Sequence, residues 1–203
     1  VENPNPDVIL PCYVLGDPLA MGSAIANLPA LITYKFNTNG VPASHSGGTP
    51  GVPDPTTLAT YAELGATYGV AFSRQAKKSF VSAVMRRHSG FGPLGPGGIY
   101  LVDQDPLTND AKAFFSLDDL GFPTHIPLGM GSYPAPTASN VSPVSDIVGS
   151  NAQRGLSTGL FQPNTDHVAG DQVGKVSLGD IDISDDGRYL YIVNLHDRHL
   201  YKI

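Results

Sequence analysis

The sequence predicts an all-β fold, namely a partial β-propeller of antiparallel four-stranded blades with long Gly/Pro-rich insertions between the blades. A strand–turn–strand–turn–strand pattern near the C-terminus is the first observation, and its recurrence earlier in the chain is the second. Composition is the third, because 23 Gly and 18 Pro make up about a fifth of the 203 residues and only 15% are charged. Such a composition is typical of a loop-rich β protein.

The C-terminal pattern occupies residues 178–203. Ile181 and Ile183 alternate with aspartates, which is the period-two signature of a strand with two unlike faces. Residues 184–187, Ser-Asp-Asp-Gly, have turn chemistry, and residues 189–193 are rich in aromatic and β-branched types. A second polar turn precedes a third strand at 199–203. We therefore expect an antiparallel meander, the repeating unit of a propeller blade, cut after its third strand.

The earlier copy lies 111 positions upstream. This shift places Val70 on Ile181, Phe80 on Tyr191 and, after a ten-residue insertion around residues 86–98, Tyr100 on Tyr201. Residues 113–117 supply the fourth strand. An internal repeat of this kind indicates a repetitive β architecture.

We expect one incomplete propeller-like domain over residues 1–203. It divides into N-terminal strands and a loop (1–66), the first full blade (67–117), a long insertion over one face (118–175) and a truncated blade (176–203). In the first part, strands are expected at 8–15 and 28–36, a breaker-rich loop at 37–57 and a short helical turn at 58–64. A linker between two domains is the alternative for 118–175.

The two ends of the sequence carry further expectations. The first residues lack Met and an apolar signal region, so the start reads as a mature or trimmed terminus. The last strand ends on apolar residues, which predicts either a fragment of a longer polypeptide or a subunit completed by strand exchange, with residues 8–15 as a candidate donor.

Charge and cysteine content restrict the function. The net charge of −6 argues against general binding to nucleic acid or to anionic membranes. No apolar run approaches the ~20 residues of a membrane span. The single cysteine, Cys12, lies in an apolar run and is expected to be a buried structural thiol.

Several stretches resemble a known family when taken in order: residues 12–19, 68–72, 77–80, 87–95, 98–103, 173–187 and 190–194. The most specific are Arg-His-Ser-Gly-Phe-Gly-Pro-Leu-Gly at 87–95 and Gly-Lys-Val-Ser-Leu-Gly-Asp-Ile-Asp-Ile-Ser at 174–184. Together they resemble the N-terminal propeller-like region of large secreted bacterial surface proteins, many of which carry SdrD B-like immunoglobulin-type modules. The resemblance implies a surface location and an adhesive or structural role, and it transfers no catalytic residue.

Calcium is the one cofactor that the sequence suggests. Asp182, Ser184 and Asp186, followed by Gly187, match the first half of a calcium loop. The twelfth position is Val193, where a bidentate Glu belongs, so the pattern favours a hairpin turn over a metal site.

The concentrated basic group is Arg86, Arg87 and His88. If these residues are exposed, they are candidates for binding an anion such as an acidic sugar or a carboxylate, but the pattern favours strand-end charges that are solvated or paired with Asp. Two strings match a catalytic and a cofactor-binding motif but lack the secondary structure that each motif requires. Ser157 lies in a Gly-x-Ser-x-Gly string without the strand and helix of a nucleophile elbow, and residues 90–95 match a dinucleotide fingerprint without its helix.

We therefore expect a non-enzymatic extracellular module of a bacterial cell-surface protein or surface fibre. Its expected partners are other surface-protein chains or extracellular polysaccharide. A propeller enzyme, such as a calcium-dependent lactonase or a lyase, and a carbohydrate-binding module are the alternatives.

Overall fold

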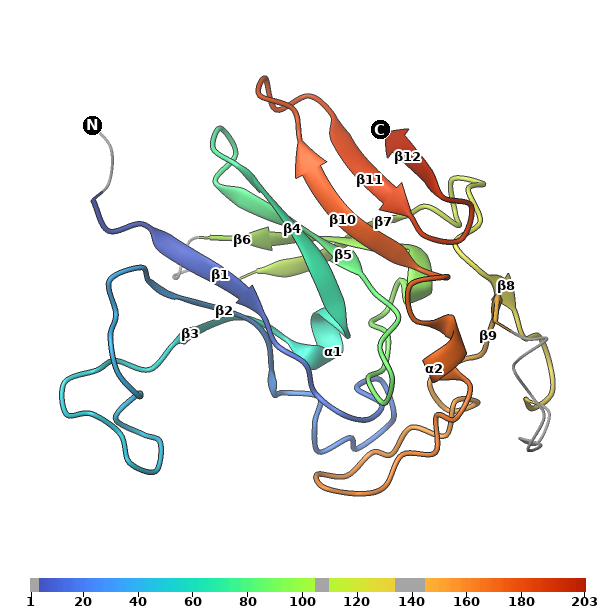
Figure 1. Cartoon of the computed structure of the whole chain (residues 1–203), viewed down its shortest axis with the longest axis horizontal. Helices are drawn as coiled ribbons and strands as arrows, with labels where there is room; N and C mark the ends of the chain where they lie inside the picture. Colours follow the sequence, from blue (N-terminus) through green and yellow to red (C-terminus); the bar gives the residue numbers. More distant parts are fainter. Residues whose placement is uncertain (1–3, 105–109, 134–144) are drawn as a thin grey trace.

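The computed structural model describes residues 4–104, 110–133 and 145–203, and in this part the chain forms four small sheets (Figure 1). Three are antiparallel and one is a parallel pair. The N-terminal sheet contains β1 (Asp7–Pro11), β2 (Pro29–Lys35) and β3 (Thr56–Thr60). The all-β expectation is thus confirmed, with the α-helices α1 (Tyr61–Leu64) and α2 (Ala169–Gln172) as short exceptions.

The two predicted meanders are present with the predicted strand order. The first sheet runs β4 (Thr67–Ser73), β5 (Lys78–Ala83), β6 (Gly98–Asp103), β7 (Ala111–Ser116), and the second runs β10 (Leu178–Ile183), β11 (Leu190–Asn194), β12 (His199–Lys202).

The register of the two sheets is equivalent at the predicted shift of 111 positions. Val70 pairs with Val81 in the first sheet, as Ile181 pairs with Ile192 in the second. The irregularity between Thr67 and Val70 recurs between Leu178 and Ile181. The repeat therefore extends to the β-bulge, a feature that re-aims a strand and is not produced by turn chemistry alone.

The repeated sheets pack against each other through their first strands, β4 and β10. Gly69 lies so close to β10 that a Cβ atom there would be 2.7 Å from the backbone nitrogen of Ile181. The Ser82 hydroxyl donates to the Gly179 carbonyl (2.9 Å) and accepts from the Gly69 amide (3.1 Å). One buried serine thus joins three strands, and the absence of a side chain at position 69 permits the approach.

The core consists of two clusters of buried apolar side chains. One fills the space between the repeated sheets and includes Ile99, Leu178 and Ile192. The other connects the N-terminal sheet to the first repeated sheet and includes Leu31, Tyr61 and Tyr100. Burial raises the pKa of both tyrosines well above the usual range.

The N-terminal region differs from expectation at three points. The strand expected over 8–15 ends at Pro11, and the loop expected over 37–57 ends where β3 begins at Thr56. The helical turn expected at 58–64 is confined to α1. Thr60 and Glu63 begin that helix, since the Glu63 carboxylate accepts from both the amide and the hydroxyl of Thr60 at 2.7 Å.

The described part of the long segment 118–175 contains β8 (Ile126–Pro127), β9 (Ile147–Val148) and α2; residues 134–144 lie outside the described residues. In Figure 1 the segment lies at the lower and right-hand edge, beside the starts of β6 and β10. The Ser177 amide, directly before β10, donates to the Thr124 carbonyl (2.9 Å). The segment is therefore attached to the sheets by specific bonds.

Candidate functional site

Three connecting segments come together at one end of the sheets, and we call this region the loop face. It consists of residues 13–24, 86–91 and 151–166. The Gly16 amide donates to the His88 carbonyl (2.7 Å), the Gly90 amide donates to the Gly16 carbonyl (3.0 Å), and the Asp17 amide donates to the Ser157 carbonyl (2.7 Å). Because these bonds connect backbone to backbone across long sequence separations, the three segments hold one another in place.

A buried ion pair lies under the loop face. The Arg154 guanidinium binds the Asp166 carboxylate through Nε–Oδ1 (3.0 Å) and Nη2–Oδ2 (2.9 Å), and both side chains are 0% exposed. Nη2 of Arg154 also donates to the Arg86 carbonyl (2.9 Å), and Asp166 accepts from the His88 amide. A two-pronged pair of this kind fixes orientation as well as charge, so it anchors residues 86–88 to the long segment.

Asn151 makes a second buried connection. Its amide group accepts from the Phe91 nitrogen (2.9 Å) and donates to the Phe91 carbonyl (3.0 Å) and to the Asp17 carboxylate (2.9 Å). One side chain therefore bonds to the other two segments of the loop face. Buried polar groups persist when they are satisfied in this way.

The predicted anion-binding residues separate into two exposed residues and one that is partly buried. Arg86 and Arg87 are exposed, and the guanidinium of Arg86 lies 3.5 Å from the centre of the Tyr13 ring. His88 is half-buried, has a positive φ of 67°, and its Nδ1 is buried without a hydrogen-bond partner among the described residues. The loop face thus presents two arginines to solvent, and His88 contributes mainly through its backbone.

The predicted calcium residues lie in the turn between β10 and β11. The Ser184 hydroxyl donates to Asp186 Oδ1 (2.6 Å) and accepts from the Tyr189 amide (3.0 Å), while Gly187 has a φ of 70°. The bond from Ser184 is the main cause that lowers the pKa of Asp186. The Asp182 carboxylate accepts from the Ile183 amide (2.8 Å). Each of the three predicted ligand residues therefore takes part in a hydrogen bond within the hairpin.

A pocket of about 320 Å³ lies beside that turn, between it and the turn joining β4 to β5. Asp182, Ser184 and Asp185 line one side and Arg74 lines the other, but Asp186 does not line it. Within the described ranges, no group of three or more His, Cys, Asp or Glu side chains is arranged to hold a metal ion. The structure therefore brings Asp182 and Ser184 to one pocket and leaves Asp186 in the turn.

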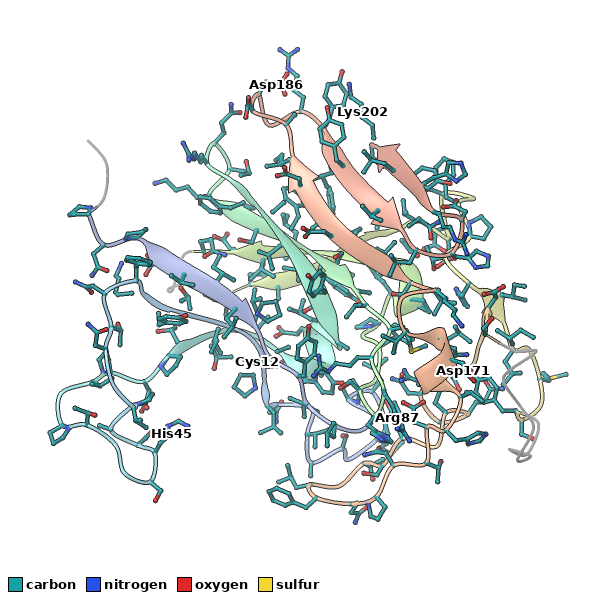
Figure 2. All side chains as sticks on the ribbon, in the orientation of Figure 1. Cys12, His45, Arg87, Asp171, Asp186 and Lys202 are labelled. Atoms are coloured by element: carbon teal, nitrogen blue, oxygen red, sulfur yellow. The ribbon has the colours of Figure 1, made fainter. Side chains whose placement is uncertain are left out.

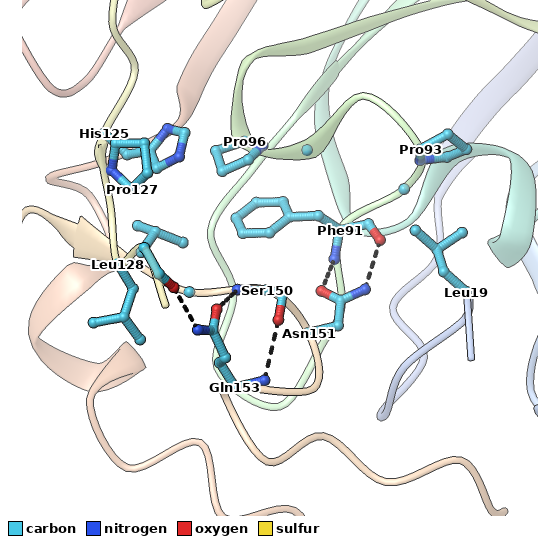
Figure 3. A pocket seen from close by; sticks show the side chains of 15 residues that line it. Leu19, Phe91, Pro93, Pro96, His125, Pro127, Leu128, Ser150, Asn151 and Gln153 are labelled. Carbon is cyan, nitrogen blue, oxygen red and sulfur yellow. Dashed lines mark hydrogen bonds between the residues drawn. The ribbon is translucent and has the colours of Figure 1, made fainter. Parts of the chain in front are cut away.

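Another pocket of about 320 Å³ lies next to the loop face and is shown in Figure 3. Its walls are mainly apolar and include Pro93; in Figure 3 the Phe91 ring lies beneath Pro96 and points toward Pro127 and Leu128. Gln153 forms the polar edge and donates to the Gly129 carbonyl (2.8 Å). His125 is its one lining residue with a titratable side chain, and its Nδ1 lies 3.5 Å from Asp118. This lining suits the binding of an apolar group better than proton transfer.

Sequence reasoning missed Arg154, Asp166 and Asn151. A usable signal existed, because Arg154 is the one Lys or Arg between Lys112 and Lys175. A lone cation in a long segment of low charge, twelve residues before an aspartate, is a candidate for a buried pair.

Ser157, which matches the nucleophile-elbow string, takes part in loop bonding. Its hydroxyl donates to the Gly159 carbonyl (3.2 Å), and its amide donates to the Asn164 side chain (2.7 Å).

Comparison with known proteins gives two similarities and no family. Colossin-D of Dictyostelium discoideum is 28% identical over 178 residues, which cover 88% of this chain and 16% of that protein. Colossin-A of the same organism is 29% identical over 101 residues, which cover 50% of this chain and 1% of that protein. No family model matches the chain, and no solved structure matches it. The chain is therefore similar to a small part of each of two much longer proteins.

Proposed function

We propose that this chain is a non-enzymatic structural and adhesive module of a large extracellular surface protein. The observation that carries the proposal is the buried bonding of the loop face, in which Arg154, Asp166 and Asn151 hold three distant segments on a sheet scaffold. Recognition surfaces are commonly built from loops that a rigid scaffold positions. The similarity to small parts of the long colossins supports a module within a larger protein.

We further propose that the two repeated sheets are blades of a β-propeller. Their equivalent registers and bulges support this, as does the contact between β4 and β10, since first strands of neighbouring blades face one another around a propeller axis. The bacterial cell-surface setting is a prediction of the family resemblance, and the two relatives come from Dictyostelium. In the described residues no helix is long and apolar enough to cross a membrane.

The proposed partners are other surface-protein chains, engaged by strand addition at β12, or extracellular polysaccharide. Strand β12 is at the edge of its sheet in the described structure, and Leu200 on it is 64% exposed. A sheet edge offers unpaired backbone groups to another strand.

Attachment of protein-coated beads tests this function. Beads carrying the chain are mixed with beads carrying the same chain, hyaluronan or neutral dextran, and we expect attachment to the same chain or to hyaluronan. Self-attachment should be lost in Leu200→Lys and kept in Leu120→Lys, a matched control at a residue that is 48% exposed. Beads that attach to none of these, together with calcium-dependent turnover of a lactone, would replace the proposal by the enzyme alternative.

A further inference from the structure

The loop face carries large apolar side chains on protruding tips. Met21 and Phe161 are as exposed as in an extended chain, at 101% and 102%, and about half of each of three leucines is exposed: Leu15, Leu19 and Leu160. The two tips belong together, because the Ala24 amide donates to the Thr158 carbonyl (2.9 Å). Fully exposed Met and Phe side chains on tips that are bonded to each other indicate an interaction site.

The exposed charge of the same face is positive, although the whole chain has a net charge of −6. Its two carboxylates, Asp17 and Asp166, are buried at 6% and 0% exposure and are bonded to Asn151 and Arg154. Arg86 and Arg87 are exposed, and neither makes an ion pair with a described residue. Figure 2 shows Arg87 at the lower edge, beside the segment of residues 157–165. The negative net charge of the whole chain therefore does not describe the loop face, whose exposed charge is positive.

Phe161 also has a strained backbone. Its φ is 60°, in the left-handed region that aromatic residues rarely occupy, at a cost on the order of 1 kcal/mol. Because the Phe161 ring is exposed to solvent, its packing does not offset this strain within the fold. Such outliers are found where the strain serves an interaction.

We propose that the loop face docks on an anionic lipid surface, with Met21 and Phe161 entering the interface and Arg86 and Arg87 contacting lipid phosphates. Protruding tips fit a bilayer interface, which accepts isolated apolar side chains, whereas a protein partner would need a matching pocket. Clustered arginines add electrostatic attraction to anionic lipids. The proposal does not depend on the surface-module function, because a peripheral lipid contact is compatible with any role of the sheets.

The absence of tryptophan from the chain provides a direct test. Phe161→Trp introduces a single fluorophore at the tip, and Phe36→Trp is the matched control, because Phe36 is 68% exposed and adjoins the start of β1, at the opposite end of the N-terminal sheet. With phosphatidylcholine vesicles containing phosphatidylglycerol, we expect a blue shift and quenching by brominated lipid for Phe161→Trp, and neither change for Phe36→Trp. Vesicles of phosphatidylcholine alone should give a much smaller change.

Co-sedimentation with the same vesicles tests the named residues in the otherwise unmodified chain. Phe161→Ser should weaken binding by about tenfold, and Arg87→Gln by about fivefold; Phe36→Ser and Arg188→Gln should bind as the unmodified chain does. Glycerol phosphate in solution should not release the protein, because a free phosphate lacks the apolar contact. Equal fluorescence changes for the two tryptophan variants would overturn the proposal, as would binding to hyaluronan without binding to vesicles.

Discussion

Replacing one member of the buried Arg154–Asp166 pair should destabilise the chain strongly. Asp166→Asn keeps the shape of the side chain but leaves the Arg154 guanidinium charged, 0% exposed and without its carboxylate. Breaking a buried pair in this way costs about 3–5 kcal/mol of unfolding free energy. For a chain of this size the melting temperature should fall by on the order of 10 °C.

A double-mutant cycle separates the pair from its surroundings. Arg154→Met alone and Asp166→Leu alone should each cost about as much as Asp166→Asn, and the double variant with Arg154→Met and Asp166→Leu should cost less than the sum of its two single variants, because no charge is left buried. The double variant will not reach the stability of the unmodified chain, since the His88 amide and the Arg86 carbonyl lose buried partners, at about 1–3 kcal/mol each.

Urea denaturation followed by circular dichroism measures all four free energies. We expect a coupling of about 1–3 kcal/mol between the two positions. Single variants that each cost less than about 1 kcal/mol would refute the reasoning that this pair anchors the loop face. Effects that add to within about 0.5 kcal/mol would refute the direct interaction.

Three further predictions concern other parts of the chain. Gly65→Ala should destabilise by at least about 1 kcal/mol more than Gly95→Ala in thermal denaturation, because both glycines have φ 65° but only the Cβ at 65 meets backbone, 2.0 Å from the Gly92 nitrogen; equal losses would contradict this. Burial alone would raise the pKa of Asp118, but bonds from His125 and Thr124 outweigh it and lower the pKa below 3.8, so the stability that Asp118 contributes is present above that pH and is lost as the pH falls through the lowered value. Melting curves in acid should therefore show a shallower decline for Asp118→Asn, and an unchanged decline would exclude the effect. Calorimetric titration with calcium should give at most weak binding, because Ser184 and Asp186 bond to the turn; submillimolar binding that Asp182→Ala abolishes would contradict that prediction.

The repeated meander could be predicted because its signals are local. Ile181 is buried while Asp180 and Asp182 are exposed, so the alternation visible in the sequence reports the two faces of β10 directly. Turn residues such as Gly187 fix the hairpin without help from distant segments. The same holds for α1, whose first turn is set by Thr60 and Glu63.

The contacts that form the loop face and β3 depend on distant segments, so local patterns do not specify them. The strand at Thr56 follows a proline-rich stretch and exists because β2 provides a partner edge, as in the pairing of Thr57 with Ile32. Arg154 and Asp166 each resemble a solvated loop charge, and their burial depends on residues 86–88, far away in sequence. The clustering of Arg86 and Arg87 is visible in the sequence, whereas the bond from the His88 amide to Asp166 is visible only in the fold.

The bond between the His88 amide and Asp166 has a consequence for the timing of synthesis. The two residues are separated by 78 positions. A ribosome that adds about 5–20 residues per second needs roughly 4–16 s to deliver the carboxylate after the amide has been made. During that interval the first repeated sheet becomes complete in sequence at residue 116, while Phe91 and the 86–88 backbone still lack the segment that binds them. The loop face therefore cannot close before residue 166 has been made, and a nascent chain that pauses between residues 116 and 151 leaves Phe91 without its bonds to Asn151.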